Sequence, residues 1–215
     1  MLSCQLSSPV ALFHLKIFHP STFKKLLPLI AFFTSSLSPL SAEDAVTVDR
    51  VKFNTVGDRW VQVEIELTCN GNPAPDAVNP DYVEKITVKP LLAYRTGSGE
   101  YNFYTSQVEI LIMEARDKNT VYFYMPGLVM ERDEIRGDPE FHYVEISIAG
   151  QVQEPQKGPA MGNISNETML KNMQAKAQAQ AEANKNILIP SYYAPLQYRA
   201  DSRKEPVYLR REPQS

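Results

Sequence analysis

The chain has 215 residues and a net charge of −3, with 43% hydrophobic and 22% charged residues, which is the composition of an ordinary globular protein. Two cysteines and three histidines in the whole chain exclude a disulfide-stapled scaffold and most zinc sites. The length suits one domain of ordinary size with extensions, or two small ones.

Residues 1–42 have the features of a secretory signal peptide. They contain three lysines and no acidic residue, and a short apolar run from Leu26 to Phe33, interrupted by Pro28, follows the lysines. A basic start, a short apolar core and a small residue such as Ala42 before the first acids are typical of such a signal. The run is too short for a membrane-spanning helix. We therefore expect an exported protein in the periplasm, at the outer membrane or on the cell surface, with no membrane span in the mature chain.

Removal of residues 1–42 takes away three positive charges and no negative ones, so the net charge of the mature chain falls from −3 to −6. Cys69 is then the only thiol and His142 the only imidazole. An intramolecular disulfide and a multi-histidine metal site are thereby excluded within one mature chain.

Residues 43–153 alternate apolar and polar positions in short segments separated by turn residues, a pattern that predicts a one-face-buried strand in each segment. The clearest case has the apolar set Val61, Val63, Ile65, Leu67 and Cys69. The alternation slips at Asp49-Arg50, as at a β-bulge, and Pro90 indicates a sheet edge or a strand break. Six to eight such strands without intervening helices predict a mainly β fold, an immunoglobulin-like antiparallel β-sandwich.

The remaining residues predict a linker at 154–164, a C-terminal α-helix at 165–186 capped by Ser165, and an extended Tyr/Pro/Arg-rich tail at 187–215. Residues 43–153 carry a net charge of −9 and residues 154–215 a net charge of +3. A basic, tyrosine-rich tail can therefore dock on the acidic sandwich of its own chain or of a neighbour. A disordered tail is the alternative. The acidic sandwich disfavours nucleic-acid binding.

Eight aromatic residues are the candidate binding residues. Four lie on strands with outward parity and four lie in the tail; they are Trp60, Tyr122, Tyr124 and Tyr143, and Tyr192, Tyr193, Tyr198 and Tyr208. The strand aromatics either form an exposed patch or lie under the C-terminal segment, and we favour the covered arrangement.

Few side chains in the mature chain are candidates for catalysis or metal binding. Cys69 shares the parity of the buried apolar residues of its strand, and His142, at a strand end, shares the parity of Val144 and Ile146. Structural roles therefore explain both residues, and a nucleophilic Cys-His pair is the alternative. Glu131, Asp133, Glu134 and Asp138 crowd one loop and could hold a cation, although their spacing fits no EF-hand. We expect no catalytic residues, no metal site and no cofactor, and hence no enzyme.

Three stretches carry a resemblance to a known family: Ala42 to Phe53 at the mature start, the strand from Trp60 to Leu67, and the segment from Phe141 to Ile148. In these stretches the chain resembles a secreted, immunoglobulin-like protein of a type IV pilus-like gene cluster of mucin-dwelling Verrucomicrobia. The resemblance implies a role in pilus assembly or surface attachment.

Two functions follow as hypotheses. One is a non-enzymatic exported interaction or structural protein of a type IV pilus-like assembly or of surface attachment, whose partners are other pilus or envelope proteins. A homo-oligomer formed through the helix and tail belongs to this hypothesis. The alternative is a β-sandwich that binds carbohydrate, such as mucin glycans, with Trp60 and outward tyrosines as stacking platforms. Glycoside hydrolysis is disfavoured because no carboxylate pair can be singled out.

Overall fold

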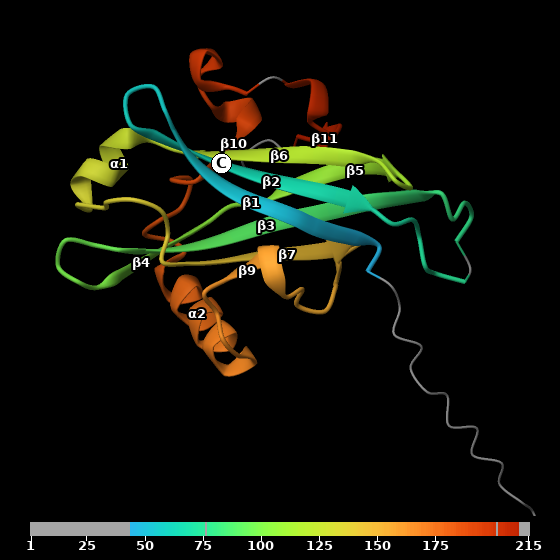
Figure 1. The fold of residues 1–215 in the computed structure, drawn as a ribbon, viewed down its shortest axis with the longest axis horizontal. Coiled ribbons are helices and arrows are strands. Elements are labelled where there is room, and N and C mark those ends of the chain that lie inside the picture. The colour runs from blue at the N-terminus through green and yellow to red at the C-terminus, as the bar shows by residue number, and fades with distance from the viewer. Residues whose placement is uncertain (1–43, 76, 201, 211–215) are drawn as a thin grey trace, which may run out of the picture. The chain divides into compact units, whose positions relative to one another are not determined.

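A computed structural model describes residues 44–75, 77–200 and 202–210. The expected signal peptide, 1–42, lies outside the described residues. The described chain forms two antiparallel β-sheets packed face to face, with a helix on the outer face of one sheet and the C-terminal segment on the outer face of the other (Figure 1). The prediction of a mainly β sandwich followed by a helix is confirmed.

The first sheet has the strand order β1-β2-β6-β10. Its strands are β1 (Val46–Val56), β2 (Trp60–Cys69), β6 (Lys118–Met125) and β10 (Ile189–Pro190). The register between β1 and β2 shifts between Val48 and Arg50, which is the bulge that the slipped alternation predicts. β1 is one edge of this sheet, and β10, from the C-terminal segment, is the other.

The second sheet has the order β11-β5-β3-β7-β8, with β4 also pairing β3 and β9 also pairing β7. Its strands are β3 (Tyr82–Arg95), β4 (Tyr101–Thr105), β5 (Val108–Glu114), β7 (Phe141–Ile148), β8 (Gln151–Val152), β9 (Met161–Gly162) and β11 (Tyr208–Leu209). The expectation that Pro90 marks an edge or a break is wrong. Pro90 lies inside the central strand β3, at the point where its neighbour on one side changes from β5 to β4, so the ladder on that side is already interrupted there.

The core lies between the two sheets and is filled by the residues of each strand that share the inward parity. On β2 the inward side chains of Val63, Ile65, Leu67 and Cys69 are 0% exposed, as the alternation predicts. The largest fully buried side chains of this core include Tyr94, Tyr104, Phe123, Ile65 and Met113.

In the described residues before 187, two α-helices and a 3-10 helix, η1 (Gly158–Ala160), interrupt the β structure. The sequence did not predict α1 (Gly127–Arg132), a short helix after β6. Gly127 is required at its start, because a Cβ atom there would lie 2.2 Å from the backbone oxygen of Asp58. α2 (Glu167–Gln180) is shorter than the predicted range 165–186. Its N-cap is Asn166 and not Ser165: the Asn166 side chain accepts a 2.8 Å hydrogen bond from the Met169 N–H.

The described part of the C-terminal segment, residues 187–210, is not an extended tail. It contains β10, β11 and three short 3-10 helices: η2 (Ser191–Tyr193), η3 (Leu196–Tyr198) and η4 (Ser202–Lys204). Arg199 stabilises the turns because its guanidinium donates hydrogen bonds to the carbonyl oxygens of Tyr192, at 2.7 Å, and Ala194, at 2.9 Å. The segment docks on the sandwich of its own chain. In the part of the chain that the structure describes, no helix is long and apolar enough to cross a membrane.

Candidate functional site

The eight candidate aromatic residues do not form one site. The structure divides them into three groups, on the outer face of the first sheet, beneath α2, and beside the β5–β6 side of the sandwich. The first group is Trp60, Tyr122, Tyr124 and Tyr198; the second is Tyr143; the third is Tyr192, Tyr193 and Tyr208.

The first group lies between the outer face of the first sheet and the C-terminal segment. The rings of Trp60 and Tyr198 lie 5.3 Å apart, and the hydroxyl of Tyr198 donates a hydrogen bond to the Asp58 carboxylate. Tyr122 is 8% exposed and Tyr124 0%. Of the two arrangements considered from the sequence, an exposed patch or residues covered by the C-terminal segment, the structure has the covered one. The rings of Tyr122 and Tyr124 are therefore not accessible for stacking.

Tyr143 belongs to the second sheet and is separate from the first group. It is 3% exposed beneath α2, where it packs in a cluster with Leu91, Leu170 and Met173. Burial, together with the nearby carboxylate of Glu145, raises the pKa of Tyr143 to about 12. Its role in the folded protein is to seat the helix on the sheet.

The third group surrounds Tyr192. Its ring centroid lies 4.7 Å from that of Tyr193 and 5.5 Å from that of Tyr208, and the Arg210 guanidinium lies 5.5 Å from the same centroid. Of the three residues, Tyr193 is the most exposed, at 47%.

Side-chain amides cover two of the sheet edges. On β4, Gln180 accepts from the Phe103 N–H at 2.9 Å and donates to the Tyr101 carbonyl at 3.1 Å, and Asn184 donates to the Phe103 carbonyl at 2.8 Å. On β1, Gln153 and Gln156 make the equivalent contacts to the backbone of Val46 and Val48, at 2.6–3.3 Å. Glutamine and asparagine suit this task because an amide both donates and accepts, like the backbone of a paired strand.

The edge formed by β11 is different. The β11 backbone pairs with β5 on one side, where the Leu111 N–H donates to the Val207 carbonyl at 2.8 Å, and no described strand pairs with its other side. The aliphatic side chains there are exposed: Val207 by 61%, Leu209 by 36% and Leu111 by 42%. An apolar, unpaired edge is a ready template for another strand.

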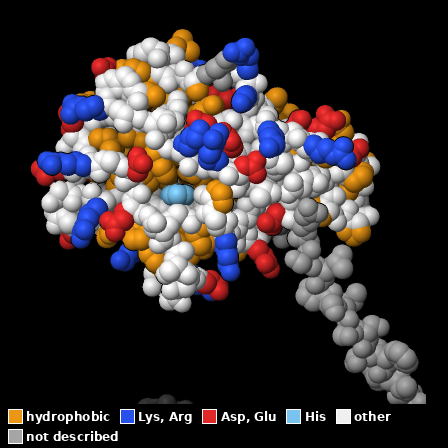
Figure 2. All heavy atoms as spheres, viewed as in Figure 1, with side chains coloured by type: hydrophobic (Ala, Val, Ile, Leu, Met, Phe, Trp, Pro, Cys, Tyr) orange, Lys and Arg blue, Asp and Glu red, His pale blue; other side chains and the backbone are white. Residues whose placement is uncertain are grey.

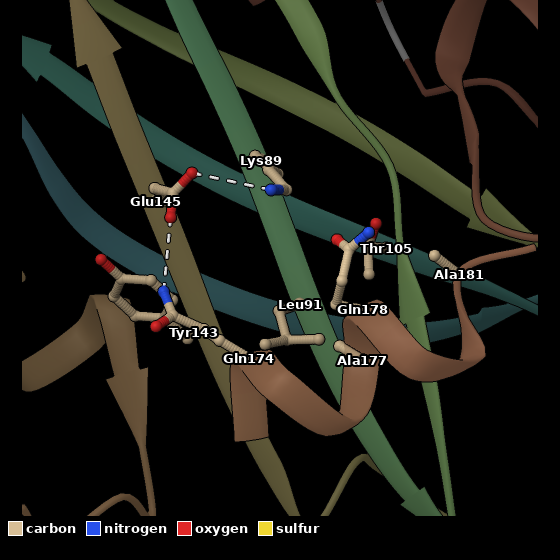
Figure 3. Close-up of a pocket in the computed structure, with 9 residues that line it drawn as sticks. All are labelled: Lys89, Leu91, Thr105, Tyr143, Glu145, Gln174, Ala177, Gln178 and Ala181. Carbon is tan, nitrogen blue, oxygen red and sulfur yellow. Dashed lines mark hydrogen bonds and ion pairs between the residues drawn. The ribbon is translucent and has the colours of Figure 1, made fainter. Parts of the chain in front are cut away.

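A groove of about 870 Å³ lies on the outer face of the second sheet, beyond the C-terminal end of α2. Its floor comes from β3, β5 and β7 and its wall from residues 181–193. A smaller pocket of about 70 Å³ adjoins it under α2. Figure 3 shows that pocket: Gln174 and Ala177 of α2 face the floor, where the Lys89 ammonium lies 3.8 Å from the Glu145 carboxylate.

The sequence missed this groove because its floor residues, Thr87, Lys89, Glu145 and Ser147, are ordinary outward positions of predicted strands. One feature of the sequence is consistent with the groove: the outward positions of β3 and β7 are polar where the groove lies and apolar where α2 covers the sheet.

Cys69 and His142 do not form a nucleophilic pair, since they belong to different sheets. Cys69 is 0% exposed, and burial raises the pKa of its thiol, which disfavours the reactive thiolate. The His142 ring nitrogen Nε2 lies 3.1 Å from the Pro159 carbonyl oxygen, and burial lowers the pKa of the imidazole. His142 packs edge-on against Phe53 and joins β7 to β1.

The acidic residues near α1 do not lie in one loop, because Glu131 is part of the helix. Glu131 pairs with Arg59, while Asp133 pairs with Arg132 and accepts a hydrogen bond from Tyr104. Arg132 holds the pKa of Asp133 below its usual value. Among the described residues, no group of three or more Asp, Glu, His or Cys side chains is placed to hold a metal ion.

Charges of both signs are interspersed over the face of the molecule in Figure 2, without a continuous basic field.

No family model matches this chain, and no curated protein does. Among solved structures, the chain is similar to the crystal structure of a protein from Akkermansia muciniphila, with 13% sequence identity and a TM-score of 0.55. The likeness covers 77% of this chain and 93% of that chain. At this identity the likeness establishes a common fold, and function has to be argued from sites on that fold.

Proposed function

We propose that the chain is a non-enzymatic, exported structural or interaction protein that takes part in a type IV pilus-like assembly or in attachment at the cell surface. The observation that carries the proposal is the open edge of β11. Val207 is 61% exposed there, beside Leu209 and Leu111, and a strand of a partner protein can pair with this backbone and bury these side chains.

Several other edges of the sandwich are covered, although β8, the opposite edge strand of the same sheet, also has an exposed valine, Val152 at 60%. β6 is covered by β10, the start of β1 by Gln153 and Gln156, and β4 by Gln180 and Asn184. The rest of β1 carries Arg50 and Lys52, and charged side chains discourage strand pairing. A chain that protects these edges and leaves an apolar one open is suited to a directed contact with a partner.

Two further observations support export and a surface role. Residues 1–42 have the composition of a secretory signal, and the resemblance in the mature chain is to a protein of a pilus-like gene cluster. The structurally similar protein comes from Akkermansia muciniphila, which belongs to the bacterial group of that resemblance.

The competing carbohydrate-binding hypothesis, as drawn from the sequence, relied on the outward aromatics of the strands. Three of them, Tyr122, Tyr124 and Tyr143, are between 0% and 8% exposed and lie beneath other parts of the same chain. A sugar ring cannot stack on a covered face, so this arrangement does not favour the alternative at those residues.

The test is affinity purification of the tagged protein from cross-linked native envelope. We expect mature protein beginning near Glu43 to be recovered with products of the pilus-like gene cluster. Val207→Lys should abolish their recovery, because it places a charge on the pairing edge. Leu128→Lys is the matched control, since Leu128 is a 76% exposed aliphatic residue on α1, and it should retain the partners. Recovery of the wild-type protein alone, or equal recovery from both variants, would contradict the proposal.

A further inference from the structure

The outer face of the second sheet changes from apolar to polar along strands β3 and β7. Where α2 packs, the outward residues are apolar or aromatic: Leu91 and Ala93 on β3, and Tyr143 on β7. Beyond the end of α2, the same strands present Thr87 and Lys89, and Glu145 and Ser147, to the groove. The helix therefore covers the apolar half of the face, and the polar half is left as the floor of the groove.

The walls of the groove add groups of two kinds. Hydrogen-bonding side chains come from Ser106 and Gln107 before β5, and from Asn184 and Asn186 after α2. Apolar groups stand along the other rim, where Pro190, Leu209 and the tyrosine pair Tyr192 and Tyr193 lie. A polar floor beside an exposed aromatic ring offers a ligand both hydrogen bonds and a stacking surface.

The charges that line the groove balance each other. Lys89 lies 3.8 Å from Glu145, and the Gln174 amide donates to the same carboxylate at 3.4 Å (Figure 3). Lys185 pairs with Glu182 at 3.6 Å, and Glu109 supplies a second carboxylate to the lining. The lining holds two lysines and two glutamates, and Glu182 adds a carboxylate beside Lys185, so the groove has no excess of positive charge for a phosphate, a sulfate or a carboxylate and suits a neutral ligand better.

A polypeptide fits this floor less well than a sugar. The floor is the face of a sheet, and a face presents side chains, whereas the backbone groups that hold an added peptide strand lie at sheet edges. Hydroxyl groups of a sugar both donate and accept, which matches the Thr, Ser, Gln and Asn side chains and the Lys89–Glu145 pair. The apolar C–H face of a sugar ring can pack on the 47% exposed Tyr193.

We propose that this groove binds a neutral oligosaccharide, with Tyr193 as the stacking residue and the side chains of Lys89, Glu145 and Ser147 as hydrogen-bonding groups. The site is distinct from the covered aromatics of the first sheet, and it adjoins the β11 edge, with which it shares Leu209 but not Val207. It does not depend on the assembly role proposed above.

The test is a titration of isotope-labelled mature protein, followed by NMR, with a panel of neutral oligosaccharides and a matched panel of sialylated and sulfated ones. We expect neutral members to shift the amide signals of the groove residues. Tyr193→Ala should weaken binding by between about twofold and tenfold, the loss expected for one aromatic contact. Tyr82→Ala is the control, because Tyr82 is a 36% exposed tyrosine outside the groove, and it should leave the affinity unchanged.

A second variant separates binding from folding. Ser147→Ala removes a floor hydroxyl at the surface of β7, so it should weaken binding while the thermal midpoint stays that of wild type. The proposal is overturned if no neutral oligosaccharide shifts the groove signals at millimolar concentration, if only the acidic panel binds, or if Tyr193→Ala binds as well as Tyr82→Ala. Photo-cross-linking from position 106 in native envelope that captures a polypeptide would also overturn it. Val207→Lys should bind the sugars normally, so the two proposals fail separately.

Discussion

The hydroxyl of Tyr124, on β6, accepts a 2.9 Å hydrogen bond from the backbone N–H of Ala200, 76 residues later in the chain. The same hydroxyl accepts a second 2.9 Å bond from the side-chain amide of Gln62, which is itself 7% exposed. One buried tyrosine therefore joins the C-terminal segment to two strands of the first sheet.

Tyr124→Phe tests this junction. The variant removes both hydrogen bonds and leaves the buried Gln62 amide without that partner, so we expect a loss of about 1–3 kcal/mol in the free energy of unfolding. Urea denaturation measures it. Tyr82→Phe, at a 36% exposed position, should change stability by under about 0.5 kcal/mol. Equal effects in the two variants would mean that the segment is not held through Tyr124.

Ile65→Ala tests the packing between the sheets. Ile65 is 0% exposed at the centre of β2, and truncation there leaves a cavity, so we expect a loss of about 2–5 kcal/mol. Its neighbour Glu64 points outward, and its carboxylate lies 3.8 Å from the ammonium of Lys52 at the surface. Glu64→Ala should therefore cost no more than about 1 kcal/mol. A comparable loss at both positions would contradict the strand assignment.

The strand alternation was sufficient to predict the sandwich, because burial of one face imposes the same two-residue period on each strand. The bulge at Asp49-Arg50 was visible for the same reason. Pro90 does not end β3, because the neighbouring strand on one side changes from β5 to β4 at this position and the proline interrupts no continuous ladder there. The sequence alone does not show where that change of neighbour occurs. The short helix α1 has too few residues to show a helical period.

The candidate site was predictable only in part. Parity placed Tyr122 and Tyr124 on an outer face, but the residues that cover them come from 187–200, far away in the sequence. Strands of two residues, such as β10 and β11, cannot show an alternation, so the sequence predicts a tail there. The groove depends on where α2 ends over the sheet, and no local signal sets that position.

Asn184→Ala tests the covering of the β4 edge. Asn184 is 9% exposed and its amide donates to the Phe103 carbonyl at 2.8 Å, so its loss leaves a backbone acceptor unpaired. We expect a cost of about 1–3 kcal/mol in urea denaturation. Asn184 also donates to the Gln180 side-chain oxygen that accepts from the Phe103 N–H, so the Phe103 amide should exchange faster in the variant as well. Gln178→Ala, at an exposed position of α2, serves as the control and should change neither quantity. Unchanged Phe103 exchange in Asn184→Ala would argue against the amide cap.

Stability should fall at alkaline pH. Burial raises the pKa of Tyr143 to about 12, and burial together with the hydrogen bond to Asp133 raises that of Tyr104 to about 12, against about 10 in an unfolded chain. Between these values the unfolded state has lost protons that the folded state retains, so unfolding becomes more favourable as pH rises from about 10 to 12. Below pH 10 both states are protonated and this contribution is constant.

Urea midpoints measured from pH 8 to 11.5 check this dependence. Tyr143→Phe should remove about one proton from the number released on unfolding, as obtained from the slope of stability against pH. A spectrophotometric titration in which all 11 tyrosines ionise together near pH 10 in the folded protein would contradict it.

The C-terminal segment completes the sandwich of its own chain and leaves β11 as an open edge. Hydrogen exchange at the amides of Leu111 and Ala200 tests this arrangement most directly, because the first donates to Val207 and the second to Tyr124. We predict that both amides are protected in the purified mature protein, and that their protection is the same over a hundredfold dilution. Protection that disappears on dilution would show that the segment docks on a neighbouring molecule, and exchange at unfolded-chain rates at every concentration would show that it does not dock; either result would contradict the account.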